Sequence, residues 1–203
     1  MNILFICVQK GRVFLKNPDT RVQMTKRLLQ GSLLSLLEEK PIGRVTVKEI
    51  VDAAGINRGT FYLHYDTPLS LLKEIENDFI RDNMELFESF MREGYDRSYL
   101  SLLFESIWKN RETLCILLGP NGDPSFLQSL REFSRGRTID EWNTEFPRYS
   151  RDQLNFLYEF VFPGFTNLMV SWFKNDHGVS AKEFTHRMER LGHYALLAVE
   201  EFH

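Results

Sequence analysis

The sequence predicts an all-α protein. Long segments repeat apolar residues at intervals of three and four, several Ser or Thr residues are followed three positions later by Glu or Gln, and alternating β-branched runs are scarce. At 203 residues, 43% of them hydrophobic, the chain can form a small helical head and a larger helical body, or one fused helical domain.

The first predicted helix runs from about Arg21 to Glu39 and ends before Pro41, since proline restricts the residue before it. Its inner side is expected to carry five leucines, namely Leu28, Leu29, Leu33, Leu36 and Leu37. We expect this helix to brace the two short helices that follow it.

Residues 45–64 read as a helix-turn-helix unit. Thr46 and Glu49 form a T-x-x-E capping box, so a helix is predicted to begin near Val47. Gly55 ends this helix, because glycine readily adopts the left-handed conformation at that position. The buried face of the helix comprises Val47, Ile50, Val51 and Ala54.

The second helix of the unit is predicted to begin near Arg58. Asn57 is a favourable N-cap, and Ile56 and Phe61 are spaced as a hydrophobic staple. With Phe61 turned inward, the exposed face offers hydrogen-bonding groups from Arg58, Gly59, Thr60, Tyr62 and His64.

This unit resembles the N-terminal DNA-binding domain of the TetR family of bacterial transcriptional regulators. The matching positions are Thr46, Ile50, Ala54, Gly55, Ile56, Gly59, Thr60, Phe61, Tyr62, His64 and Tyr65. The resemblance implies a homodimer that places one recognition helix from each subunit in successive major grooves of double-stranded DNA, on a near-palindromic operator. It divides the chain into an arm at residues 1–19, a helix-turn-helix domain at 20–66 and a helical regulatory and dimerisation domain at 67–203.

Roles in DNA binding follow from position within this unit. Arg58 is the candidate for a base contact, because its guanidinium matches guanine O6 and N7. Tyr62 is expected to anchor a phosphate, Lys48 to contact backbone or base, and Thr60 to meet a thymine methyl or a phosphate.

Three further residues belong to the expected DNA-binding set. Gly59 lets the backbone come close to DNA, and Thr46 lies at the start of the first helix of the unit. His64 has two open readings, packing on the first helix or contact with DNA.

The segment after the recognition helix departs from the family pattern. Most relatives have a basic residue at the position of Pro68 and often another at that of Asp66. Thr67 and Pro68 still make a sound helix start. We therefore expect weaker nonspecific binding and a shallower salt dependence than the family norm.

Charge is divided unevenly along the chain. Residues 1–64 hold 10 Lys and Arg against 5 Asp and Glu, whereas residues 65–203 hold 15 against 23, and the whole chain carries −3. A basic end on an acidic body orients a protein on DNA.

A long helix is predicted from Pro68 to about Met91, roughly 36 Å in length, which can connect the head to the body. Its apolar stripe comprises Leu72, Ile75, Phe79, Leu86 and Phe90. Further helices are expected at about 98–110, 112–118, from Pro124, 151–174 and 181–202, with a plain turn at 119–123 and a kink at Pro163-Gly164.

Residues 98–200 are similar to the C-terminal regulatory domain of a Firmicutes-associated branch of the family, which includes regulators related to that of dihydroxyacetone kinase. The segment GDPSFLQSL followed by a tryptophan carries this similarity. It implies that the last two helices pair with their copies in a second subunit. The interface or core residues there are Leu154, Phe165, Leu168, Trp172, Leu191, Tyr194, Leu197 and Val199.

Aromatic residues of the body are candidates for an apolar pocket that binds an unknown small-molecule effector. The expected lining residues are Phe104, Trp108, Phe126, Phe162, Phe165 and Met169. Each of them, taken singly, fits a core position better than a pocket position.

Enzymatic and metal chemistry are not indicated. The sequence has no G-x-S-x-G elbow, no dinucleotide glycine motif and no cysteine cluster, so no catalytic residue, cofactor or metal is expected. His186, Glu189 and His193 share a helix side but read better as a solvated or interface face. Cys7 and Cys115 suit a reducing cytoplasm, and the apolar start MNILFICVQ is too short to span a membrane.

Two functions remain open at this point. The favoured one is a ligand-responsive transcription factor, commonly a repressor. The alternative is a DNA-binding helical protein that is regulated by a protein partner and has no small-molecule site. A closed core would favour the partner, and a hydrophobic cavity of a few hundred Å³ would favour the ligand.

Overall fold

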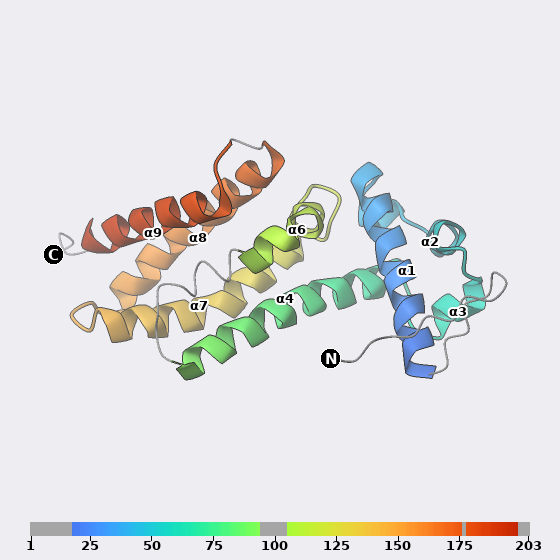
Figure 1. Ribbon diagram of the computed structural model, residues 1–203, viewed down its shortest axis with the longest axis horizontal. Coiled ribbons are helices and arrows are strands. Elements are labelled where there is room, and N and C mark those ends of the chain that lie inside the picture. The colour runs from blue at the N-terminus through green and yellow to red at the C-terminus, as the bar shows by residue number, and fades with distance from the viewer. Residues whose placement is uncertain (1–17, 94–104, 176–177, 199–203) are drawn as a thin grey trace, which may run out of the picture.

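The computed structural model describes residues 18–93, 105–175 and 178–198, and all regular structure in these ranges is helical. A head made of α1 to α3 lies at one end of the molecule, and α4 runs from it along the body, where α6 to α9 are stacked (Figure 1). The predicted all-α class, with a small helical head and a larger helical body, is confirmed. The arm predicted at 1–19 lies outside the described residues up to residue 17, and its last two positions belong to α1.

The head is built on α1 (Pro18–Glu39), a 3-10 turn η1 (Ile42–Arg44), α2 (Val47–Ala54) and α3 (Arg58–Tyr62). Its core consists of Leu29, Leu33, Leu37, Val45, Ile50, Val51, Phe61 and Tyr65. The prediction for Leu28 is wrong, because its side chain is 46% exposed. The buried line on α1 follows Leu29, Leu33 and Leu37 at intervals of four, which turns Leu28 about 100° away from it.

The predicted capping box opens α2. Thr46 Oγ1 accepts from the Glu49 N–H at 3.3 Å, and the Glu49 carboxylate accepts from the Thr46 N–H at 3.0 Å. Lys40, just after α1, also pairs with this carboxylate. The hydrogen bond from Lys40, followed by those from Thr46, lowers the pKa of Glu49 to about 2. One carboxylate thus fixes both the start of α2 and its attachment to the end of α1.

The long helix α4 (Pro68–Glu93) crosses α1. Leu71, Leu72 and Ile75 are buried at the crossing. Beside them Lys26 donates to Glu74 at 2.9 Å, and the Tyr65 hydroxyl donates to the same carboxylate at 3.1 Å. The predicted start at Pro68 is confirmed, whereas the side chains of Leu86 and Phe90 lie outside the described set.

The body contains a helical turn at residues 105–109, α6 (Arg111–Leu117), α7 (Ser125–Glu145), α8 (Arg151–Lys174) and α9 (Ala181–Ala198). The predicted capping box of α8 is present, and Ser180 accepts from the Glu183 N–H at 3.2 Å at the start of α9. α8 continues without a break through Pro163 and Gly164, where the sequence predicts a kink. None of the described helices has the length and apolar character needed to cross a membrane.

The buried apolar residues of the described ranges form two hydrophobic cores. The larger one is continuous from the head into the body, since Leu114, Leu117, Phe126, Met169 and Trp172 pack in the same cluster as the head residues. The smaller one lies among α7, α8 and α9 and comprises Ile139, Tyr149, Leu154, Leu157, Tyr158 and Leu196. The head is therefore not a separate domain on a flexible stalk.

The 119–123 loop joins head to body as well as connecting α6 to α7. The Asn121 amide donates to the Leu37 carbonyl at 2.9 Å, and the Ile42 N–H donates to the Asn121 carbonyl at 2.9 Å. Two residues on, Asp123 pairs with Lys73 of α4 at 2.6 Å, and the hydrogen bond from Lys73 lowers the pKa of Asp123. Prediction of a plain turn gave the shape of this loop but not its contacts with α1, η1 and α4.

Gly122 is buried in this loop, and a Cβ there would overlap the carbonyl oxygen of Leu117. We expect Gly122→Ala to lower the free energy of unfolding by about 1–3 kcal/mol, because backbone must shift. Urea unfolding followed by circular dichroism measures it. Gly136→Ala on α7 is the control, since its Cβ would meet no atom within 4 Å. Equal losses for both variants would contradict the close packing of the loop.

The capping box makes the head sensitive to acid. Since the pKa of Glu49 falls from 4.5 to about 2 on folding, its contribution to stability is complete above pH 4.5 and is lost as pH falls towards 2. We expect the difference in Tm between the wild type and Glu49→Gln to shrink over this interval. Glu39→Gln controls for net charge. A difference that stays constant from pH 7 to 2.5 would rule the mechanism out.

Candidate nucleic-acid interface

The recognition helix α3 is fixed by its first turn and by its buried side. Gly55 has φ 65° and ψ 32°, the left-handed geometry predicted for the turn before it. The Asn57 side chain accepts from the Thr60 N–H at 2.8 Å and from the Thr60 hydroxyl at 3.0 Å. Phe61 is fully buried, and Ile56 packs against the same core. The predicted cap and the inward position of Phe61 are therefore confirmed.

The outer face of α3 presents Arg58, Gly59 and Tyr62 to solvent, while Thr60 is half-buried. Arg58 and Tyr62 contact each other across one turn. Arg58 Nε and Nη2 donate to the Tyr62 hydroxyl at 3.3 and 2.9 Å, and the guanidinium carbon lies 5.4 Å from the centre of the ring. Arg58 and Tyr62 thus form one unit before DNA is bound.

The other expected DNA-binding residues are placed differently. Lys48 is exposed on α2. The backbone N–H and the hydroxyl of Thr46 both donate to Glu49, so its donors are engaged in the capping box. His64 is half-buried, with its ring 6.1 Å from that of Tyr65. Both of the readings left open for His64 are compatible with this position.

One residue that the sequence did not single out belongs on this surface. Leu63, the C-cap of α3, is 79% exposed beside Tyr62. Exposed leucine is common on proteins, so the residue type alone gives no signal. Its position at the end of a helix whose other apolar residues face inward makes it a candidate for contact with a thymine methyl.

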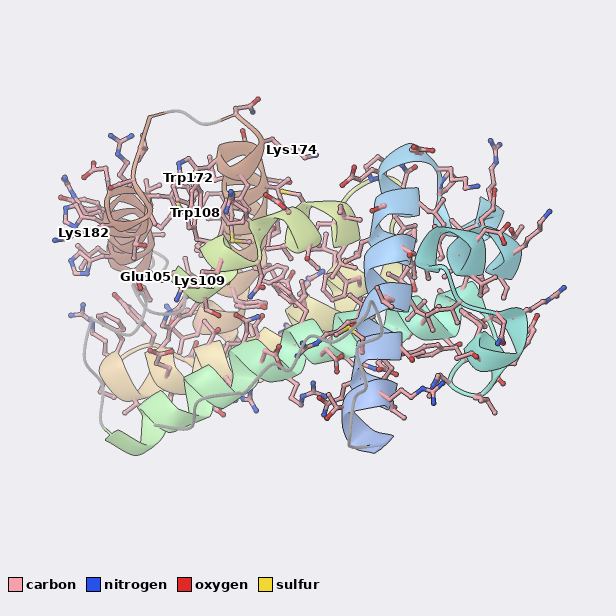
Figure 2. The ribbon with its side chains drawn as sticks, turned by 45° about the vertical axis from the view of Figure 1, so that its right-hand side comes forward. Glu105, Trp108, Lys109, Trp172, Lys174 and Lys182 are labelled. Atoms are coloured by element: carbon pink, nitrogen blue, oxygen red, sulfur yellow. The ribbon has the colours of Figure 1, made fainter. Side chains whose placement is uncertain are left out.

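The expected pocket residues that the structure describes are divided between the two cores. Phe126 and Met169 are buried in the larger core, with Trp108 and Phe165 packed against it. Phe162 instead packs against the smaller core, and Phe104 lies outside the described residues. Figure 2 shows Trp108 beside Trp172, with ring centroids 4.5 Å apart.

The described surface has an opening beside α1 and α4 and another between α7 and α8. An open depression of about 830 Å³ adjoins α1 and α4, lined among others by Lys26, Lys73 and Asp78. A groove of about 460 Å³ between α7 and α8 is lined by Arg131, Arg135 and Phe162 among others. Both are more polar than the aromatic pocket that the sequence predicts. Among the described residues, no three His, Cys, Asp or Glu side chains are grouped to hold a metal ion.

Eight residues of the last two helices are predicted from the sequence to lie either in the core or at a subunit interface, and the structure separates buried members from exposed ones. Leu154 and Trp172 are buried and Phe165 is half-buried. Leu168, Leu191, Tyr194 and Leu197 are exposed, as are Phe156 and Phe160, while Val199 lies outside the described residues. The exposed members lie on α8 and α9, which pack side by side (Figure 1).

Comparison with known proteins agrees with this architecture. A family model described as "Bacterial regulatory proteins, tetR family" matches residues 33–75, and one described as "Transcriptional regulator C-terminal region" matches residues 97–194. The HTH-type transcriptional regulator YxbF of Bacillus subtilis is 33% identical over 63 residues, which are 30% of this chain and 17% of YxbF. The HTH-type transcriptional repressor KstR2 of Rhodococcus jostii is 34% identical over 62 residues, 30% of either chain. The match thus spans less than a third of these relatives.

Solved structures extend the similarity to most of the chain. A TetR transcriptional regulator from Streptococcus agalactiae superposes with a TM-score of 0.62 and 26% identity, over 89% of this chain and 96% of that one. The dihydroxyacetone kinase operon activator DhaS shares the fold, with a TM-score of 0.53 and 17% identity over 87% of this chain and 96% of its own. One family model matches the head, including its helix-turn-helix, and a second matches the body. This chain therefore belongs to the TetR family of bacterial transcriptional regulators, which are DNA-binding proteins and not enzymes.

Proposed function

We propose that this DNA-binding regulator works as a homodimer on a near-palindromic operator, and that it is a ligand-responsive repressor. The observation that carries the DNA-reading part is α3 itself, a short helix anchored by Phe61 whose outer face holds Arg58, Gly59 and Tyr62 in solvent. The repressor KstR2 gives the sign of regulation that we propose for this chain.

The hydrogen bonds of the head refine the proposed contacts. A hydroxyl carries one proton, and that of Thr60 is already donated to Asn57, so Thr60 is better placed to meet a thymine methyl than to donate to phosphate. Arg58 reads guanine and Lys48 contacts a phosphate. Gly59 allows close approach, and Asp66, which is exposed, lowers the electrostatic attraction near the end of α3.

Dimerisation is proposed to bury the exposed apolar side chains of α8 and α9. Phe160 is 73% exposed, Tyr194 59% and Leu191 55%. A patch of large apolar side chains on two adjacent helices is typical of a subunit interface. In a twofold dimer the same patch meets itself, so each residue contributes to the interface twice, once from each subunit.

Response to a ligand is proposed to reach α3 through the shared core and the 119–123 loop. A change in the position of α6 or α7 moves Asn121, which is bonded to the end of α1 and the start of η1. The groove between α7 and α8 is the candidate ligand site that fits the structure better than the aromatic set.

The partner-regulated alternative keeps one supporting observation. Phe126 is fully buried and Met169 is 4% exposed, so these two expected pocket residues fill a core rather than line a space. A protein partner would then act on the outer surface of the body.

Selection of bound sequences from a random DNA pool tests the proposed reader. We expect an inverted repeat for the wild type. Arg58→Ala should keep the repeat but lose preference at one guanine in each half-site, at a cost of roughly 1–3 kcal/mol. Lys48→Ala is the control. It should weaken binding to all sequences alike and reduce the slope of log affinity against log salt concentration by about 1. Folded protein that enriches no motif would refute the proposal.

The subunit interface can be tested separately by measuring mass in solution. We expect the wild type at about twice the chain mass of 24.0 kDa, and Phe160→Glu at the mass of a single chain, because a buried charge has no partner there. Leu28→Glu, on the exposed side of α1, is the matched control and should remain dimeric. A dimeric Phe160→Glu would exclude this face.

A further inference from the structure

The hydroxyl of Tyr62 has two roles available to it at once. In the structure it accepts hydrogen bonds from Arg58 Nε at 3.3 Å and Nη2 at 2.9 Å. A phenolic oxygen that accepts these bonds still has its own proton to donate. The resemblance to the family predicts only a phosphate contact for Tyr62. That contact uses the hydroxyl proton, so the two hydrogen bonds from Arg58 stay in place.

The bonds to Tyr62 leave a defined edge of the guanidinium free. Arginine has five N–H donors in a planar fork. With Nε and one N–H of Nη2 directed to Tyr62, both N–H groups of Nη1 and the second of Nη2 remain. The Nη1 and Nη2 protons on the outer edge are parallel, which is the arrangement that pairs with guanine O6 and N7.

Tyr62 is the group that sets this orientation. Among the described residues, no other side chain or backbone group bonds the Arg58 guanidinium, and no carboxylate pairs with it. The ring lies below the guanidinium at 5.4 Å, and the two residues are one helical turn apart on the same face. A long, exposed arginine is otherwise free to sample many rotamers, and fixing it before binding reduces the entropy lost on contact with a base.

We propose that Tyr62 is a positioning residue for base reading. Its hydroxyl holds the Arg58 guanidinium with the outer edge towards the major groove, while its proton goes to a phosphate. One side chain thereby links the contact that sets the register on the duplex to the contact that reads sequence. This inference rests on the proposed function, because it requires that Arg58 reads a base.

The test compares the wild type, three variants and one control variant on two DNA duplexes. One duplex is the selected operator. The other is a copy with adenine in place of one guanine, the one that Arg58→Ala no longer prefers. Dissociation constants are measured at one salt concentration for the wild type, Tyr62→Phe, Arg58→Ala and the double variant. Phenylalanine keeps the ring below the guanidinium and removes only the hydroxyl.

We define the ratio as the dissociation constant for the adenine duplex divided by that for the operator. We expect Tyr62→Phe to weaken binding to both duplexes. It should also reduce this ratio by about three- to tenfold, as for loss of an ordinary hydrogen bond. In the Arg58→Ala background the same change should weaken both duplexes equally, since no guanidinium is left to position. Lys48→Ala is the control, and it should leave the ratio unchanged.

The contact between Tyr62 and Arg58 can also be tested in the free protein, without an operator, by hydrogen exchange. The Arg58 Nε–H resonance should exchange faster with water in Tyr62→Phe than in the wild type, and Leu63→Ala, an exposed neighbour, should not change it. Unchanged exchange of Nε–H would overturn the proposed contact.

The outcomes separate this inference from the proposed function. If folded wild type enriches no motif, or Arg58→Ala relaxes no position, the base-reading role of Arg58 fails and the inference fails with it. If Arg58→Ala relaxes one position but Tyr62→Phe weakens both duplexes equally, Tyr62 is a phosphate anchor alone and only the inference fails. If Tyr62→Phe raises the ratio, Tyr62 holds Arg58 away from the base, which also overturns it.

Discussion

The crossing of α1 over α4, and the single core that fills it, determine how every other part of the protein can act. Leu29, Leu33, Leu71 and Leu72 are fully buried there, in the same cluster as residues of α6, α7 and α8. The bonds of Asn121 to the end of α1 and the start of η1 secure the same junction from the body side. Because protein cores deform little, α3 cannot change its direction unless α1 or α4 also moves.

This rigidity supports the proposal that the helical body controls the DNA-reading head. If two bodies associate through α8 and α9, the distance between the two α3 helices depends on how the helices that connect each α3 to that interface are packed. Any molecule that binds the body and favours a different packing changes the separation, and DNA must affect its binding by the same factor. The Lys26–Glu74–Tyr65 cluster and the Lys73–Asp123 pair lie on this route, where α4 meets the head and the 119–123 loop.

The sequence predicts the features that depend on residues close together in the chain, but not the contacts between residues far apart. The capping box at Thr46, the left-handed turn at Gly55 and the N-cap at Asn57 depend on residues at most three or four apart, and all are present. The contact of Asn121 with Leu37 joins positions 84 apart and has no local signature. The Arg58 and Tyr62 pair has i, i+4 spacing and was within reach of the sequence. The aromatic pocket stays a prediction, because large apolar residues fit both a core and the lining of a cavity.

In the proposed dimer, the two bodies hold the two α3 helices at a fixed spacing on one face of the duplex. Hydroxyl-radical footprinting of the full-length wild type on its selected operator tests it most directly. We expect two protected segments, related by twofold symmetry and centred one helical turn of DNA, about 10 base pairs, or a multiple of it apart. A single protected segment, or two on opposite faces of the duplex, would contradict the account.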